Sequence, residues 1–231
     1  MLLHRRYKSL DRNTLPWLRA SYHFRVDPQG NPEHSALGPL YVWNDDEVAV
    51  GAGFPMHGHR AVEIVSYVRH GVLQHRDSLG SEGLLHGGEV QVMSAGTGIR
   101  HAEANHGKVP LRLYQIWLKP RTPDAEPRWE TRPIPREPGN GFTVLASGLP
   151  GDEAALPINA DARVLSAMLK AGDYLRHPLG LARQAYLVVA SGRIDIDGEI
   201  MTMGDGAVIL GVEATHIIAL QDSELVMVEV A

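Results

Sequence analysis

Glycine and proline interrupt this chain every eight to twelve residues, and short β-rich runs lie between them. The clearest runs cover residues 41–43, 64–68, 90–93, 113–118, 186–189 and 225–230. Many short strands at this spacing favour a β-barrel or a β-sandwich over alternating strands and helices. Helical patterning is scarce, and its best candidate, residues 161–169, is equally consistent with a strand. The sequence therefore predicts an all-β fold.

A proline-rich segment divides the 231 residues into two halves. Six of the fifteen prolines fall between residues 119 and 140, which excludes a central strand or a helix there. We expect an N-terminal domain at residues 1–120, a linker or wrapping arm at 121–141, and a C-terminal domain at 142–231. Each half contains a strand that ends in a glycine, Gly71 or Gly192, followed by a turn, a strand and a second glycine-bearing turn. This pattern indicates a tandem duplication of one small β-barrel.

The composition excludes several classes of function. The chain has 27 acidic and 22 basic residues, so it lacks the basic excess that nucleic-acid binding requires. The absence of cysteine excludes disulfides, thiolate metal sites and cysteine nucleophiles. The longest apolar stretches are far shorter than the ~18 residues of a membrane helix, and no secretory signal is visible. We expect a cytoplasmic protein that binds neither nucleic acid nor a membrane.

Histidine is concentrated at one end of the chain, with ten of the twelve residues among the first 106. His57 and His59 stand two apart, a spacing that places both side chains on one face of a strand. His101 and Glu103 repeat this spacing just after a glycine-rich turn. Three imidazoles and one carboxylate suit a divalent transition metal and leave positions open for water or substrate. The sequence therefore predicts an open, catalytic type of metal site.

These residues fall in two motifs that resemble those of the cupin superfamily. The first motif matches at Gly51, His57, His59 and Glu63, and the second at Gly88, Gly98, His101 and Asn105. Three features depart from the usual pattern: seven residues rather than six separate Glu63 from Gly71, Ser94 replaces a proline, and two extra residues precede the second-motif histidine. The same departures mark the pirin family, which the strings at residues 43–46, 57–64, 74–78 and 94–103 also resemble. The resemblance is dense in the N-terminal half and rests only on topology and length in the C-terminal half.

The resemblance implies two tandem cupin barrels (a bicupin) of the bacterial, quercetinase type of pirin. It also implies that His57, His59, His101 and Glu103 bind one divalent metal, with Fe(II) expected and Ni, Mn, Zn or Cu as alternatives. The implied activity is quercetin 2,3-dioxygenase, which uses O2 to cleave a flavonol. In this hypothesis Glu103 is also the catalytic base that accepts the flavonol proton.

Two other functions compete with the dioxygenase. Some pirins are described as regulators that act through protein contacts, so a metal-dependent module with a protein partner is the main alternative. A sugar isomerase or hydrolase is a third hypothesis, for which Arg60 and Arg100 are the obvious anion-binding residues. A deep apolar pocket over the metal would favour the enzyme.

Several residues near the motifs are expected to play structural or supporting roles. Glu63 is expected to orient a ligating imidazole rather than to bind the metal, and a solvated or capping carboxylate at the surface is the alternative. His70, His75, His86 and His106 are expected to be structural or to face solvent, and the Asp45–Asp46 pair to cap a turn. The four tryptophans, Trp17, Trp43, Trp117 and Trp129, are expected to fill a core or an interface. Counting from the repeated glycines places Pro178, Gly180, Ala219 and Gln221 at the four ligand positions of the second barrel, which predicts no metal there.

Overall fold

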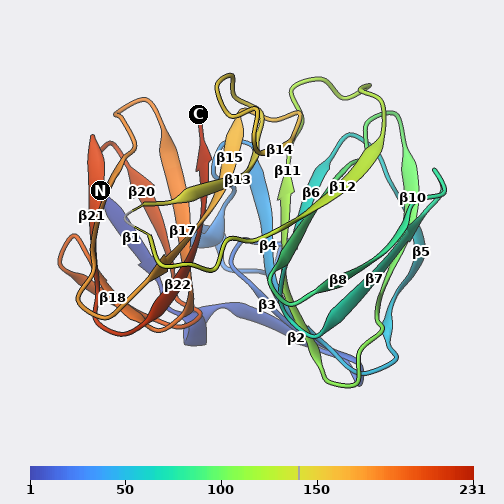
Figure 1. Cartoon of the computed structure of the whole chain (residues 1–231), viewed down its shortest axis with the longest axis horizontal. Helices are drawn as coiled ribbons and strands as arrows, with labels where there is room; N and C mark the ends of the chain where they lie inside the picture. Colours follow the sequence, from blue (N-terminus) through green and yellow to red (C-terminus); the bar gives the residue numbers. More distant parts are fainter. Residues whose placement is uncertain (140) are drawn as a thin grey trace.

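The computed structural model describes residues 1–139 and 141–231, which form two β-barrels side by side (Figure 1). Each barrel consists of one seven-stranded and one four-stranded sheet. The only helical elements in the described residues are two short 3-10 turns, η1 (Tyr7–Ser9) and η2 (Pro32–His34). All six of the clearest predicted runs lie within strands, which confirms the all-β, two-barrel fold.

The N-terminal barrel combines two sheets whose strands are given in spatial order. The large sheet contains β12 (Arg128–Pro133), β9 (Glu89–Ser94), β6 (Glu63–His70), β11 (Leu111–Leu118), β4 (Leu40–Val48), β3 (Leu18–Tyr22) and β2 (Asp11–Thr14). The small sheet contains β5 (Gly53–His59), β10 (Ile99–Asn105), β7 (Val72–Asp77) and β8 (Glu82–His86).

The C-terminal barrel repeats this arrangement. Its large sheet contains β1 (Leu2–Arg5), β20 (Gly206–Leu210), β17 (Gln184–Ser191), β22 (Ser223–Val230), β15 (Ala162–Leu169), β13 (Thr143–Ser147) and β14 (Leu156–Pro157). Its small sheet contains β16 (Tyr174–Pro178), β21 (Ala214–Ala219), β18 (Arg193–Ile196) and β19 (Glu199–Thr202). The strand order 9-6-11-4-3 of the first barrel corresponds to 20-17-22-15-13 in the second. This match in strand order supports the duplication inferred from the glycine pattern.

The two barrels exchange chain segments and share a core. The N-terminal strand β1, blue in Figure 1, pairs with β20 of the C-terminal barrel, although it lies within the segment expected to form the first domain. Strand β12 comes from the proline-rich segment and pairs with β9 at the edge of the first barrel. Asn140, which the predicted linker includes, lies outside the described residues. Between the large sheets, buried aromatic rings such as Trp43, Tyr114 and Tyr186 pack edge to face.

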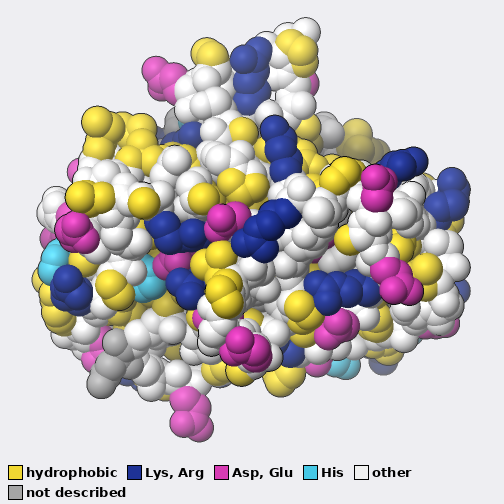
Figure 2. All heavy atoms as spheres, turned by 90° about the horizontal axis from the view of Figure 1, so that it is seen from above, with side chains coloured by type: hydrophobic (Ala, Val, Ile, Leu, Met, Phe, Trp, Pro, Cys, Tyr) yellow, Lys and Arg dark blue, Asp and Glu magenta, His cyan; other side chains and the backbone are white. Residues whose placement is uncertain are grey.

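The surface is mixed in character. On the face in Figure 2, acidic and basic side chains are interspersed with apolar ones rather than gathered by sign. Within the described residues, no helix has the length and apolar character needed to cross a membrane.

Candidate metal centre

Three histidines converge inside the N-terminal barrel, on the inner face of its small sheet. His57 and His59 lie on β5, and His101 lies directly opposite His57 on the neighbouring strand β10. The ring centroids of His57 and His101 are 4.5 Å apart, and those of His59 and His101 are 5.0 Å apart. Each of the three rings has a nitrogen within 4.8 Å of a nitrogen of the other two, a spacing that a single ion can bridge. The i, i+2 pattern of both motifs thus corresponds to one cluster.

The ring nitrogens of this cluster fit a metal ion. Nε2 of His59 and both ring nitrogens of His101 are buried and have no hydrogen-bond partner among the described residues. Nδ1 of His57 lies 2.8 Å from the carbonyl oxygen of Pro55, to which it donates a hydrogen bond when it carries the proton. That bond fixes the tautomer and leaves the Nε2 lone pair of His57 free for coordination. Buried polar atoms without partners are costly, and a metal ion would satisfy them.

Burial keeps the imidazoles of His59 and His101 neutral, the form that binds metals. Removal from water, together with the nearby His57, lowers the pKa of His59 to about 4. The same cause, reinforced by three neighbouring histidines, lowers the pKa of His101 to about 3. At neutral pH these two residues therefore offer uncharged ring nitrogens to a metal ion.

Glu103 lies two residues after His101 on the same inner face and is buried, but it belongs to a second cluster. Its carboxylate groups with His101 and His75, while the first cluster contains His57, His59 and His101. Ser66 Oγ donates a hydrogen bond to Oε1 of Glu103 over 3.2 Å. The side-chain amide of Gln91 donates to the same oxygen, and that of Gln115 donates to Oε2. Burial raises the pKa of Glu103, while these donors and His75 act in the opposite direction. The carboxylate is thus fixed at the edge of the histidine cluster.

His75 is a site residue that sequence reasoning assigned to the surface or to a structural role. It is fully buried on β7 directly opposite Glu103, and its Nδ1 has no partner. Nε2 of His75 lies 3.1 Å from Oδ2 of Asp77, and its ring stacks on Trp129 at 4.7 Å. The alternation of Leu73, His75 and Asp77 along the predicted strand could have revealed this, because period 2 places all three inside.

Other expectations about acidic residues need correction. Glu63 is buried and accepts hydrogen bonds from Ser94 Oγ, at 2.6 Å, and from the backbone N–H of Asn159, at 3.1 Å. It therefore links the two barrels rather than orienting an imidazole. Asp45 and Asp46 lie in the middle of β4, not in a turn, and point to opposite faces of the sheet. Burial, with Asp45 and Glu103 nearby, raises the pKa of the inward-facing Asp46 to about 8.

The second barrel does not repeat this set of side chains. The pair His177 and Thr215, which lie opposite each other, corresponds to the pair His57 and His101 of the first barrel. The pair Ile196 and Ile217 corresponds in the same way to His75 and Glu103. The counterparts of His57, His59, His101 and Glu103 are thus His177, Leu179, Thr215 and Ile217, not the four residues obtained by counting from glycines. Nε2 of the one retained histidine, His177, is bonded to Glu229. The count failed because the segment before Gly192 is one residue longer than the segment before Gly71, and because Gly206 is paired in its sheet as Val90 is, not as Gly88 is.

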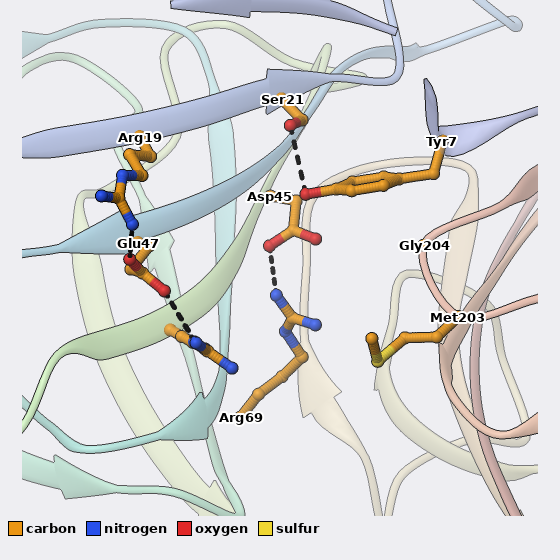
Figure 3. A pocket seen from close by; sticks show the side chains of 9 residues that line it. Tyr7, Arg19, Ser21, Asp45, Glu47, Arg69, Met203 and Gly204 are labelled. Atoms are coloured by element: carbon orange, nitrogen blue, oxygen red, sulfur yellow. Dashed lines mark hydrogen bonds and ion pairs between the residues drawn. The ribbon is translucent and has the colours of Figure 1, made fainter. Parts of the chain in front are cut away.

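Two hollows in the surface differ in their relation to the cluster. A cleft of about 350 Å³ between the barrels is lined by Arg19, Arg69, Arg112, Asp45 and Glu47, whose charges pair with one another (Figure 3). It lies on the outer face of β4, across the sheet from the histidines. A second, open hollow of about 330 Å³ reaches His59 and is bordered by Arg60 and Arg100. Both guanidinium groups sit at the surface, where Arg60 pairs with Asp124.

Comparison with known proteins identifies the family. The pirin family model matches residues 4–118, and the model of the quercetinase C-terminal cupin domain matches residues 144–230. The chain belongs to the pirin family. A pirin-like protein of Caulobacter vibrioides is 45% identical over 216 residues, which are 93% of each chain. The quercetin 2,3-dioxygenase of Escherichia coli K12 is 32% identical over 212 residues, 91% of this chain and 90% of that one.

The fold of a solved pirin agrees with that of this one. The bacterial pirin YhhW of Escherichia coli, in complex with nickel(II), superposes with a TM-score of 0.93 at 30% identity. The match covers 100% of this pirin and 99% of that chain. Membership in the family and a histidine–carboxylate group inside the first barrel together make this pirin a candidate metal-binding protein.

Proposed function

We propose that this pirin is a metal-dependent dioxygenase that cleaves a flavonol such as quercetin. The observation that carries the proposal is a cluster of three imidazoles beside a carboxylate that three side chains hold in place; two of the imidazoles, His59 and His101, have buried ring nitrogens without partners among the described residues. The quercetin 2,3-dioxygenase of Escherichia coli, to which this chain is similar over nine-tenths of its length, supports the choice of substrate class.

His57, His59, His101 and Glu103 are the residues that would hold the metal, with Fe(II) the ion we expect in the cell. When bound, such an ion supplies a Lewis acid that binds a deprotonated hydroxyl and a redox centre for dioxygen chemistry. The three histidines bring ring nitrogens close to one point, and those of His59 and His101 are already neutral, so metal binding requires no loss of protons from these two at neutral pH.

Glu103 would accept the proton of the flavonol 3-hydroxyl. Burial raises the pKa of its carboxyl group, which makes the carboxylate a stronger base than one in water. The bonds from Ser66, Gln91 and Gln115 keep it from rotating away from His101. A base with a fixed position and a raised pKa suits proton abstraction near neutral pH.

The other hypotheses find less support. Arg60 and Arg100 border the hollow that reaches His59, but Arg60 is paired with Asp124 and Arg100 donates a hydrogen bond to the carbonyl oxygen of Met56, which argues against a site for sugar phosphates. The regulatory alternative is favoured by one observation: the hollow that reaches His59 is open to solvent, and Met56 beside it is exposed. A protein partner could sense the metal through this surface.

Turnover by the metal-loaded protein tests the proposal. Protein stripped of metal and reloaded with one equivalent of Fe(II) should bleach quercetin in air-saturated buffer and consume O2, and the stripped protein should not. A double variant, His57→Ala with His101→Ala, should lose both metal and turnover, whereas His216→Ala, an exposed histidine of the second barrel, should retain both. Fully loaded protein that binds quercetin but leaves it intact would overturn the enzyme and favour the regulatory module.

A further inference from the structure

We propose that Trp117 and Trp129 are positioning residues for Glu103, each acting through one glutamine whose amide group holds the carboxylate. This inference rests on the proposed function and deepens it, because in that function Glu103 is both a metal ligand and the base that accepts the flavonol proton. It concerns two tryptophans that the sequence assigned to packing alone.

The first of the two connections comes from the segment between the barrels. Nε1 of Trp129, on β12, donates a hydrogen bond to Oε1 of Gln91 over 2.8 Å. Nε2 of the same amide donates to the Glu103 carboxylate and, over 3.1 Å, to Ser66 Oγ. Ser66 in turn donates to Glu103. The side chain of Gln91 therefore connects the Trp129 indole to the Glu103 carboxylate.

The second connection repeats the first from within the barrel. Nε1 of Trp117, on β11, donates to Oε1 of Gln115 over 3.2 Å, and Nε2 of Gln115 donates to the other carboxylate oxygen of Glu103. Each carboxylate oxygen is thus held by one glutamine, and each glutamine by one indole. Trp117 also packs edge-on against His59, with 5.0 Å between the ring centroids.

The chemistry of these groups permits only one orientation of each amide. An indole N–H can only donate a hydrogen bond, and an ionised carboxylate can only accept one. A glutamine between them must turn its oxygen to the indole and its NH2 group to the carboxylate. Without the indole, the amide could rotate by 180° and present its oxygen to the carboxylate, which would repel it. The indoles therefore select the orientation that holds Glu103.

The surroundings of Trp129 are built to fit it. Its ring lies parallel to that of His75, with an interplanar angle of 8°. Gly83 on β8 faces the same indole, and a Cβ at that position would lie 2.5 Å from it. Since Trp129 comes from the proline-rich segment, this segment completes the site as well as connecting the barrels.

The test replaces each indole by a ring that cannot donate. Trp129→Phe keeps the stacking on His75 but removes the N–H. We expect its dissociation constant for Co(II), measured by competition with a chelator, to rise about tenfold or more, in the range found for residues that support metal ligands. Trp117→Phe should act in the same direction. The matched control is Trp43→Phe, since Trp43 is buried in the core between the barrels and its N–H has no partner among the described residues. The Co(II) affinity of this variant should stay within twofold of that of the parent.

A double-mutant cycle separates positioning from a general loss of structure. If Trp129 acts through Gln91, then Trp129→Phe should change the Co(II) affinity little once Gln91→Leu is present. Equal effects of Trp129→Phe in both backgrounds would overturn the inference.

A measurement on the metal-free protein distinguishes this inference from the proposed function. The side-chain NH2 signals of Gln91 and Gln115 in NMR spectra should be sharp in the parent, and that of Gln91 should broaden in Trp129→Phe. An unchanged Gln91 signal would overturn the positioning role even if the protein proves to be a dioxygenase. A broadened signal in a protein that binds no metal would overturn the proposed function and leave the indole–glutamine contact intact.

Discussion

The two barrels share a strand order but differ in what fills them at equivalent positions. In the first barrel a row of four polar residues crosses the inner face of the large sheet in register: Gln91, Ser66, Gln115 and Asn44. In the second barrel the same four positions hold Ala207, Leu187, Met227 and Leu165, all part of its apolar core. The polar row faces Glu103, whereas the apolar row faces Ile217.

This difference shows that the site needs more than its ligands. A buried carboxylate is tolerated only where donors satisfy it, because an unpaired buried charge is costly. The first barrel supplies these donors from a sheet opposite the strand that carries Glu103. The second barrel lacks three of the four ligand side chains and also the donors, and apolar side chains fill the space. The fold therefore specifies a frame that accepts either a polar site or an apolar core.

The strongest way to test this contrast is to remove matched histidines from the two barrels. His101→Ala removes the residue shared by both ligand clusters and should lower metal affinity by more than about a hundredfold, beyond the loss found for supporting residues. His177→Ala removes the counterpart of His57 and should leave metal content unchanged, because its ring is bonded to Glu229. Metal analysis of both purified variants checks this. A metal ion lost from His177→Ala would place a site in the second barrel.

Glu103→Gln tests whether the polar row serves chemistry as well as binding. The amide can still coordinate weakly through its oxygen, but it cannot accept a proton. Flavonol turnover per bound metal should therefore fall by roughly 10²–10⁴-fold, the usual contribution of a general base. Rates are compared at equal metal occupancy, with quercetin binding measured separately. A fall only in proportion to lost metal would restrict Glu103 to a ligand role.

Acid should affect the first barrel through its buried histidines. The pKa values of His59 and His101 lie at about 4 and about 3, against an ordinary value of 6.5, because burial disfavours the charged ring. Below pH 6.5 the unfolded chain binds more protons at these histidines than the folded one. Their contribution to the stability of the metal-free protein is therefore fully present above pH 6.5 and declines as the pH falls toward 4. Metal should remain bound at pH 5 and leave as the pH falls to 4 and below. Melting temperature and metal content between pH 7.5 and 4 measure both effects, and a midpoint of metal release near pH 6 would contradict this account.

The smallest effect is expected from exchanging one residue of the two rows. Gln115→Met places the residue of the second barrel in the first and leaves the Trp117 N–H and one oxygen of Glu103 without partners. Met227→Gln places an amide in the apolar core of the second barrel. Each should lower the free energy of unfolding by about 1–3 kcal/mol, the cost of an unsatisfied buried polar group. Urea denaturation measures this loss, with Met227→Leu as the control of similar volume. A Met227→Gln variant with an unchanged free energy of unfolding would show that the second barrel tolerates a polar residue in this row.

The sequence by itself determined the strands, the duplication and the histidine spacing. Alternation of side chains along a strand depends only on local geometry, so spacing alone assigns the pairs His57–His59 and His101–Glu103 to single faces. The tandem glycine pattern likewise fixed the two barrels, because a turn with positive φ requires glycine locally, as at Gly71 and Gly192.

Only the tertiary structure decided which distant residues complete the site. His75, Gln91 and Gln115 lie beside Glu103, and Trp129 beside Gln91, because separate strands pair in a particular register, and register depends on the packing of the whole barrel. The same dependence explains the miscounted ligand positions of the second barrel, because strand register, and not the distance from a glycine, sets which residues face inward. Spacing along the chain reports neighbours on one strand, whereas hydrogen bonds across the barrel depend on neighbours in space.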